Sequence, residues 1–315
     1  MTTDNATLGS VQPLVEAILD SYNAHKALIK VEPSNQINRD IIIDIIYKLQ
    51  ALIFPGFFDH KPLKRDFLLY HVGDLLEDVQ RQLSKQIKLA FNQHSPSRPR
   101  LVSAASVART FLERLPNVRD LLATDIEAAY DGDPSAFNSD EIILAYPGVF
   151  ATTVYRLAHE LYLLDIPLIP RMMTEYAHGL TGIDIHPGAT VGRRLFIDHG
   201  TGVVIGETTV IGNHVKIYQG VTLGALSTQG GHLLEGVKRH PTIEDHVTIY
   251  AGASILGGAT VVGEGVVIGS NAFITKSVPE KTKVSVKNTE LRFLSEARKD
   301  PPPESLQEEF WDWVI

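Results

Sequence analysis

The chain has 315 residues, with 29 basic and 37 acidic side chains and a formal net charge of −8. Hydrophobic residues make up 44% and charged residues 21%, which excludes a largely disordered chain and supplies one large domain or two ordinary ones. The mild acidity gives no electrostatic reason to expect a nucleic-acid or anionic-membrane partner. The absence of cysteine excludes disulfides, thiolate metal sites and a cysteine nucleophile.

The N-terminal segment MTTDNATLGS is polar and lacks the basic and apolar regions of a secretory signal. No apolar run approaches the ~18 residues that a membrane-spanning helix needs. We therefore expect a cytoplasmic protein with no membrane partner.

The first 180 residues carry helical patterns. Apolar residues recur at spacings of three and four, as on one face of a helix, at Leu76, Val79, Leu83 and Ile87 and again at Val154, Leu157, Ala158 and Leu161. Segments 14–18 and 41–52 indicate further helices, while 94–100 predicts a loop and DGDP at 131–134 a turn. The sequence thus predicts an all-α domain over residues 1–180.

After residue 180 the apolar period changes to six. Aliphatic residues follow it in four series: Ile185, Val191, Ile197 and Val203; Ile205, Ile211, Ile217 and Leu223; Ile243, Ile249, Ile255 and Val261; and Val262, Ile268 and Ile274. This period is typical of a parallel β-helix, in which three short strands complete a coil of ~18 residues. We predict an α+β protein with a β-helix over 181–286 and a C-terminal tail over 287–315. The break between Leu223 and Ile243 predicts a projecting loop, a common place for function.

Three polar residues beside the first break in the repeats suggest a catalytic base. Asp198 and His199 are adjacent, so they point in different directions and have separate roles. Asp184 precedes His199 by fifteen residues, which can bring the two onto neighbouring rungs. A carboxylate that accepts one imidazole N–H leaves the other nitrogen free to take a proton from an alcohol. The alternative is that the acids are corner residues and the histidine is a solvated turn residue.

Arg239 and His240 stand at the end of the expected loop, where a guanidinium fork suits a substrate carboxylate. The alternative is a solvated loop pair. A zinc site would need three convergent ligands from the histidines in or near the repeats, which are His186, His199, His214, His232, His240 and His246. The spacing of the last two does not match the metal-binding histidines of the β-helical carbonic anhydrases, so we expect no metal.

The repeat region carries four motifs in order, DIHP (184–187), DHGTG (198–202), GVTLGA (220–225) and RHP (239–241), after DGDPSA, YPGVF and YRLAHELY in the helical region. This set closely resembles the serine O-acetyltransferase family, whereas other hexapeptide acyltransferases share only the rhythm. The resemblance covers residues 118–286. It implies a helical domain followed by a left-handed β-helix, and homotrimers with active sites between neighbouring β-helices. In many members two trimers join into a hexamer.

The resemblance also implies the reaction. An acetyl group would pass from acetyl-CoA to the hydroxyl of L-serine, giving O-acetyl-L-serine and CoA in the first step of cysteine biosynthesis from serine. It assigns the general base to His199 and the carboxylate that orients this base to Asp184. Serine-binding roles fall on Asp133, Asp198, Arg239 and His240.

Further expectations follow from the same resemblance. Acetyl-CoA is a co-substrate, with no permanently bound cofactor, and its pantetheine arm would pass Gly224, Ala225 and Ala251. L-Cysteine would act as a feedback inhibitor in the serine pocket. The tail ends in Ile315, which in the family enters the active site of O-acetylserine sulfhydrylase; the alternative is an amphipathic end that packs on its own domain.

Two other functions stay open at this point. An acyltransferase for a sugar or an antibiotic alcohol would keep His199 but has no reason to combine Asp133, Asp198 and Arg239, which suit the two charged groups of an amino acid. A non-catalytic protein that regulates the sulfhydrylase would bind its partner without turnover.

Overall fold

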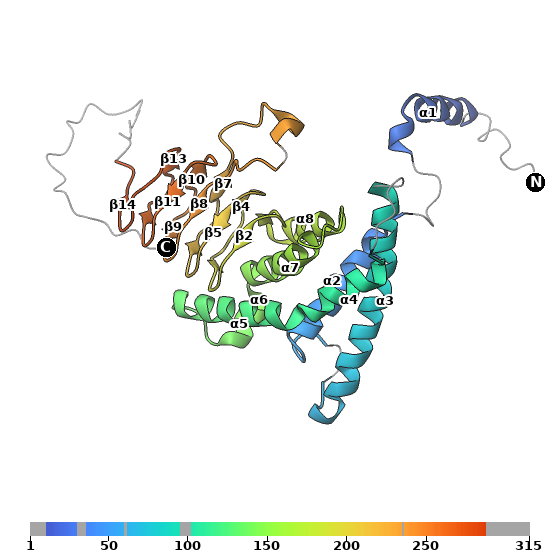
Figure 1. Ribbon diagram of the computed structural model, residues 1–315, viewed down its shortest axis with the longest axis horizontal. Coiled ribbons are helices and arrows are strands. Elements are labelled where there is room, and N and C mark those ends of the chain that lie inside the picture. The colour runs from blue at the N-terminus through green and yellow to red at the C-terminus, as the bar shows by residue number, and fades with distance from the viewer. Residues whose placement is uncertain (1–10, 30–35, 60–61, 95–101, 235, 288–315) are drawn as a thin grey trace, which may run out of the picture. The chain divides into compact units, whose positions relative to one another are not determined.

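The computed structural model describes residues 11–29, 36–59, 62–94, 102–234 and 236–287. Helices occupy the first part of the chain and short strands the second (Figure 1). The helices are α1 (Gln12–Ala24), α2 (Arg39–Ile53), α3 (Leu68–His94), α4 (Ala104–Glu113), α5 (Leu115–Gly132), α6 (Ser139–Ala145), α7 (Pro147–Tyr162) and α8 (Ile169–Thr181), with 3-10 turns η1 (Lys26–Leu28) and η3 (Arg65–Phe67). The described residues up to Ser285 form one compact unit.

The predicted helical faces are the core of the helical region. Residues of α3 and α7 that the spacing selected are fully buried: Val79, Leu83, Ile87, Val154, Leu157, Ala158 and Leu161. The segment 14–18 lies on α1, which is helical but has no buried residue. Residues 95–100 of the expected loop lie outside the described residues.

After α8 the chain forms parallel strands of two or three residues in three sheets. The first sheet has the order β1-β4-β7-β10-β13, the second β11-β8-β5-β2 and the third β14-β12-β9-β6-β3. Their bounds are β1 Asp184–Ile185, β2 Thr190–Val191, β3 Phe196–Ile197, β4 Val204–Ile205, β5 Val210–Ile211, β6 Lys216–Ile217, β7 Thr222–Gly224, β8 Thr242–Ile243, β9 Thr248–Ile249, β10 Ser254–Leu256, β11 Val261–Val262, β12 Val267–Ile268, β13 Phe273–Ile274 and β14 Lys283–Val284. Consecutive strands pass from sheet to sheet, which is consistent with the left-handed β-helix, and the fold class is confirmed.

The six-residue period predicted the inward positions because one aliphatic side chain per strand fills the interior. Ile205, Leu223 and Ile255 follow one another in the first sheet and are almost fully buried. Val203 lies two positions before the inward-facing Ile205, and Val261 lies one position before the inward-facing Val262. Val203 is buried at the corner before β4, and Val261 precedes the inward-facing residue of β11.

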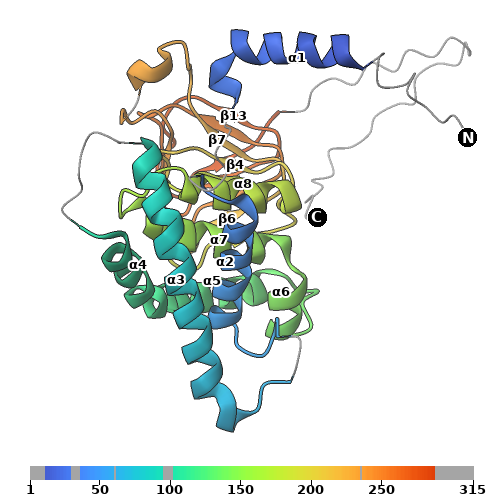
Figure 2. The ribbon, with the colours of Figure 1, turned by 90° about the vertical axis from the view of Figure 1, so that its right-hand side faces the viewer.

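The helices α5 and α7 hold the first coil, and Figures 1 and 2 show α7 beside it. The guanidinium of Arg156 on α7 donates to both carboxylate oxygens of Asp125 on α5, at 2.6 and 2.9 Å, and to the carbonyl of Gly192 at 2.7 Å. Asp125 also accepts the backbone N–H of Leu195 at 2.9 Å. This buried network fixes the residues that lead into β3.

The loop between β7 and β8 projects from the coils (Figure 1) and contains the short 3-10 helix η4 (Gly231–Leu234). The break in the six-residue period correctly predicted it. Among the helices of the described segments, none combines the length and apolar character needed to cross a bilayer.

Candidate active site

The corner between β3 and β4 brings together three of the predicted residues. Asp198 and His199 follow β3 directly, and their side chains approach to 3.8 Å between Oδ1 and Nδ1. Asp133 follows the end of α5 and lies close enough for the charge of His199 to lower its pKa. We call Asp133, Asp198 and His199 the histidine edge.

Hydrogen bonds fix the carboxylate of Asp133. Its Oδ2 accepts the hydroxyl of Tyr146 at 2.5 Å, and its Oδ1 accepts both the backbone N–H and the hydroxyl of Ser135, at 2.8 and 2.7 Å. The bond from Tyr146 is the largest cause of a lowered pKa for Asp133, followed by the bond from Ser135. The group is therefore an anion at neutral pH, ready to bind a cation.

The backbone presents His199 to solvent. Its φ of 55° lies in the left-handed region, and its side chain is 60% exposed. The next residue, Gly200, has a φ of 81°, and a Cβ there would lie 2.4 Å from the side chain of Ile183. The turn therefore needs glycine at this position, and the imidazole of His199 stands outside the coil.

Two tyrosines that the sequence analysis did not select complete this edge. Tyr146, at the start of α7, donates to Asp133, and Tyr218 stacks on Tyr250 with ring centroids 5.1 Å apart. Burial raises the pKa of Tyr218, and the charges of Asp198 and Asp133 raise it further. Tyr146 is the first residue of the YPGVF motif, so the sequence did offer a signal for it. The only signal for Tyr218 is its spacing: it follows Asp198 by twenty residues, which places it one coil further along the β-helix.

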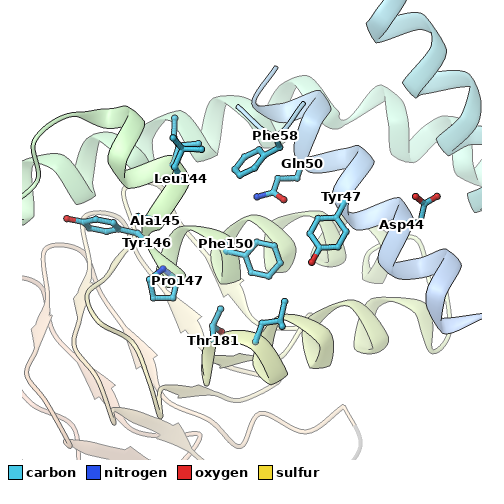
Figure 3. A pocket seen from close by; sticks show the side chains of 12 residues that line it. Asp44, Tyr47, Gln50, Phe58, Leu144, Ala145, Tyr146, Pro147, Phe150 and Thr181 are labelled. Atoms are coloured by element: carbon cyan, nitrogen blue, oxygen red, sulfur yellow. The ribbon is translucent and has the colours of Figure 1, made fainter. Parts of the chain in front are cut away.

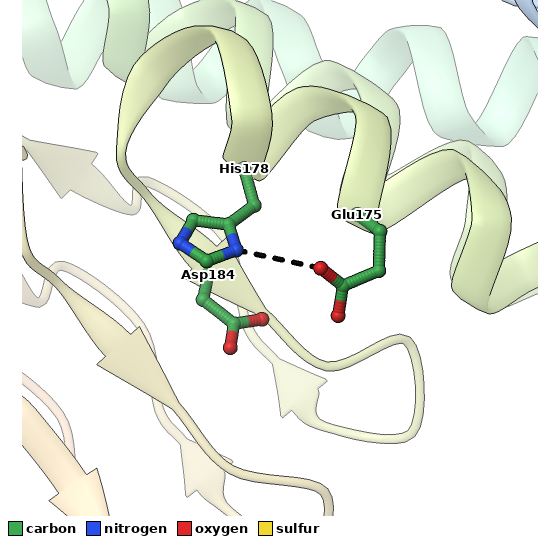
Figure 4. A group of neighbouring side chains, drawn as sticks. All are labelled: Glu175, His178 and Asp184. Atoms are coloured by element: carbon green, nitrogen blue, oxygen red, sulfur yellow. Dashed lines mark hydrogen bonds and ion pairs between the residues drawn. The ribbon is translucent and has the colours of Figure 1, made fainter.

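Asp184 takes a different position from the one expected. Its Oδ1 lies 3.6 Å from a guanidinium nitrogen of Arg171 on α8, and Glu175 and His178 of the same helix lie beside it (Figure 4). Oδ1 is buried and has no hydrogen-bond partner. Although both side chains belong to the described part of the chain, Asp184 and His199 form no ion pair or hydrogen bond within this one chain. The carboxylate nearest to the imidazole is that of Asp198.

The same cluster is the one group in the described segments whose donor atoms lie close enough to hold a metal ion: Glu175, His178 and Asp184, all within 4.8 Å. It contains none of the repeat histidines that the sequence analysis considered. Arg171 forms an ion pair with Glu175 and approaches Asp184, so a guanidinium already supplies positive charge there. These donors do not favour a metal cation.

Arg239 and His240 lie at another corner, between the first and second sheets. The guanidinium of Arg239 forms an ion pair with Glu207 and donates to the carbonyl of Leu234 at 3.1 Å. Burial opposes ionisation of Glu207, but the hydrogen bond from Arg239 and the charge of His186 outweigh it and lower the pKa. We call Glu207, Arg239 and His240 the arginine edge.

His240 is buried, with 8% of its surface exposed. Its Nδ1 accepts the backbone N–H of Thr208 at 3.0 Å, so the neutral ring carries its proton on Nε2. Burial, with the charge of Arg239, lowers the pKa of His240 to about 4, and burial does the same for His186 nearby. Gly206 makes the packing possible, because a Cβ there would lie 2.1 Å from the ring of His240.

The two edges lie on opposite sides of the first sheet. His199 precedes β4, and Glu207 follows it. No hydrogen bond or ion pair joins the histidine edge to the arginine edge within the described residues of one chain. The structure therefore brings Asp133, Asp198 and His199 together and Arg239 and His240 together, but it leaves the two groups apart.

The expected pantetheine positions divide in the same way. Gly224 ends β7 on the side of the arginine edge, and Ala225 follows it, half-buried. Ala251 lies in the corner after β9, on the side of the histidine edge, where its carbonyl accepts the N–H of Asn271 at 2.9 Å. The outer face of the first sheet lies between them. Ile315 lies outside the described residues.

Known proteins resemble this chain over most of its length. No family model matches it. A plasmid-encoded serine acetyltransferase of Synechococcus elongatus is 45% identical over 212 residues, which are 64% of this chain and 66% of that protein. The crystal structure of serine acetyltransferase 1 from Entamoeba histolytica, in complex with L-cysteine, superposes with a TM-score of 0.68 and 36% identity over 83% of this chain and 95% of the other.

The chain belongs to the serine acetyltransferase family. These proteins are hexapeptide-repeat acyltransferases, as the motifs suggested. A serine acetyltransferase from Neisseria gonorrhoeae, solved in complex with serine, is a more distant member with a TM-score of 0.52 and 26% identity over 77% of this chain and 95% of the other. Several further curated serine acetyltransferases are matched over about half of their length.

Proposed function

We propose that this protein is a serine O-acetyltransferase that transfers the acetyl group of acetyl-CoA to the hydroxyl of L-serine. The observation that carries the proposal is the histidine edge: two carboxylates, of Asp133 and Asp198, stand beside the exposed imidazole of His199. Paired acids suit the ammonium group of an amino acid, and an adjacent base suits its hydroxyl. Family membership and the serine complex of the Neisseria relative support the same substrate.

We infer that the active site is completed by a second copy of the chain. The arginine edge holds the guanidinium that suits the serine carboxylate, but it lies across the first sheet from His199. A three-fold arrangement would place the histidine edge of one copy against the arginine edge of the next. A homotrimer with sites between copies is therefore the assembly we propose, whether or not two trimers join.

In this site His199 acts as the general base. Its ring nitrogen takes the hydroxyl proton while the serine oxygen attacks the thioester carbonyl of acetyl-CoA. The new C–O bond forms, the C–S bond breaks, and the imidazolium returns its proton to the leaving thiolate. Holding both substrates in one cleft supplies the proximity that a bimolecular reaction in water lacks, an advantage worth several kcal/mol. Glu207 keeps the guanidinium of Arg239 extended toward the substrate carboxylate.

The orienting carboxylate is a separate proposal. Asp184 fits the role by family resemblance, and its buried Oδ1 has no hydrogen bond to give up. Asp198 is the nearer acid in the single chain, at 3.8 Å from Nδ1. The pH dependence of kcat distinguishes them, because loss of the orienting acid lowers the pKa of the base: Asp184→Asn should shift the acid limb of the profile, while Asp198→Asn should mainly raise the KM for serine.

The remaining assignments extend this site. The pantetheine arm of acetyl-CoA would cross the first sheet between Gly224, Ala225 and Ala251, and no cofactor would be held permanently. L-Cysteine, which is bound in the Entamoeba relative, would compete with serine because a thiol replaces the hydroxyl. We also propose that the tail ending in Ile315 binds O-acetylserine sulfhydrylase; deletion of this residue should abolish co-purification and leave acetyl transfer intact.

The deciding experiment measures CoA release from acetyl-CoA with L-serine, homoserine, a galactoside or no acceptor. The test variant is His199→Ala. The matched control is His214→Ala, because His214 has the same left-handed backbone, with φ of 58°, at a different corner. Serine-dependent turnover lost only in the first variant supports the proposal. Turnover with another alcohol alone, or none with any acceptor from folded trimers, would refute it.

A further inference from the structure

A pocket of about 690 Å³ lies within the helical region (Figure 3). Its walls come from α2 and the turn after it, from the end of α6, from the first turn of α7 and from the end of α8. Four aromatic side chains line it, those of Tyr47, Phe58, Tyr146 and Phe150, together with the exposed Leu144. This volume is in the range of small-molecule sites in proteins.

One polar side chain of this pocket, that of Gln50, is not hydrogen-bonded to another described side chain or backbone group. Gln50 on α2 is 94% buried, since 6% of its surface is exposed, yet its side-chain amide makes no hydrogen bond within the described part of the chain. Figure 3 shows the amide between the rings of Phe58 and Phe150. The other buried glutamine behaves differently: Gln86 accepts the backbone N–H of Asn38 at 2.9 Å. The amide of Gln50 therefore faces the pocket without a protein hydrogen bond, and a ligand in the pocket can bond to it directly.

The chemistry of the walls defines that ligand. An amide presents one donor and one acceptor side by side, which match a neutral carboxamide or a heteroaromatic edge with the same pair. The four aromatic rings of the walls favour a flat aromatic body. The anionic residue at the rim, Asp44, already forms an ion pair with Lys48, so the pocket offers no free charge to a charged ligand.

The pocket also touches the active site through one side chain. Tyr146 lines it and donates its hydroxyl to Asp133 at 2.5 Å. A molecule packed against the ring of Tyr146 would restrict this side chain and with it the carboxylate that we assign to the serine amine. This coupling rests on the proposed function, whereas binding to the pocket does not.

We propose that the pocket bounded by Gln50, Phe58 and Phe150 is a binding site for a small, neutral aromatic amide, and that its occupancy adjusts serine binding through Tyr146. The first test uses indole-3-acetamide as the probe and the full-length protein, with binding followed by saturation-transfer NMR and calorimetry. We expect a Kd of about 1 mM or tighter, as suits a ligand of this size. Indole-3-acetate, in which a charged carboxylate replaces the carboxamide and its N–H donors, should bind much more weakly.

Two variants locate the site. Gln50→Leu removes the amide at similar volume and should weaken indole-3-acetamide about ten-fold, while leaving 3-methylindole unaffected. Leu144→Trp should fill the pocket and abolish binding of both. Leu163→Trp is the matched control, since Leu163 is a similarly exposed leucine, at 55% against 58%, that does not line the pocket. Absence of binding to the folded wild-type chain, or binding that Gln50→Leu leaves unchanged, would overturn the site.

The second test measures coupling. Saturating indole-3-acetamide should change the KM for serine at least two-fold with little change in kcat, and Tyr146→Phe should remove that change. Binding without any effect on KM in an enzyme that acetylates serine would overturn the coupling. If the protein does not acetylate serine, the NMR and calorimetric results still decide the binding site.

Discussion

The buried ion pair between Asp125 and Arg156 gives the sharpest test of how the helices hold the first coil. Both residues are 4% exposed, and the pair is bidentate. Replacement of Asp125 by Asn leaves the guanidinium charge buried without its counter-ion and weakens the contact to Leu195. Removal of one partner from such a pair costs about 3–5 kcal/mol.

Replacing both partners by apolar residues should cost much less. The double variant Asp125→Leu, Arg156→Met leaves no unpaired charge in the core, and such exchanges are often close to neutral. The exposed pair of Arg109 and Glu113, with side chains 74% and 62% exposed, supplies the control. Arg109→Met there should cost about 1 kcal/mol or less.

The assay is denaturant unfolding of the full-length protein followed by circular dichroism, with melting temperatures as a second measure. The ordering should be wild type, surface control, double variant and then Asp125→Asn. The reasoning is refuted if Asp125→Asn is no more destabilising than Arg109→Met, or if the double variant is as unstable as Asp125→Asn.

Three further predictions concern the site and its supports. Tyr146→Phe removes the hydrogen bond to the carboxylate of Asp133 and should raise the KM for serine about ten-fold, with a smaller effect on kcat; an unchanged KM in steady-state assays would contradict the role. Gly148→Ala on α7 should destabilise the protein by about 1–3 kcal/mol, because the new Cβ would lie 2.3 Å from a backbone carbonyl oxygen of β3. The control is Gly179→Ala on α8, where no atom lies within 4 Å of the new Cβ. It should be neutral or stabilising in the same thermal unfolding measurements. The pKa of His240 falls from 6.5 to about 4 on folding, so the unfolded chain binds more protons than the folded chain between pH 4 and pH 6.5. The contribution of His240 to the free energy of unfolding is therefore full above pH 6.5 and is lost as the pH falls to 4. His240→Asn should flatten that part of a curve of stability against pH.

The β-helix was predictable because its six-residue pattern depends only on residues that are close together in the sequence. Each coil places one aliphatic residue per strand inward, so Ile205, Leu223 and Ile255 are found by counting along the sequence. The same counting located the projecting loop, where the period fails. It also selected Val203 and Val261, which lie two positions and one position before the inward-facing residues, because a fixed period cannot show where a corner gains residues.

The candidate site was predictable only in part. Adjacency gave Asp198 and His199, and the motifs gave Asp133 and Arg239, but spacing alone suggested a contact between Asp184 and His199 that the single chain does not form. Asp184 faces α8, a helix that ends three residues before it, and sequence spacing across coils does not register such a neighbour.

The sequence by itself determined the elements and the chemical inventory, because helical faces, hexapeptide rungs and motif residues depend on neighbours a few positions away. Only the tertiary structure decided which of these side chains lie together. It placed His199 and Arg239 on opposite sides of one sheet, set Tyr146 against Asp133, and put Gln50 in the wall of an aromatic pocket. These relations depend on how α7 and α2 pack against distant segments, and packing of that kind leaves no period in the chain.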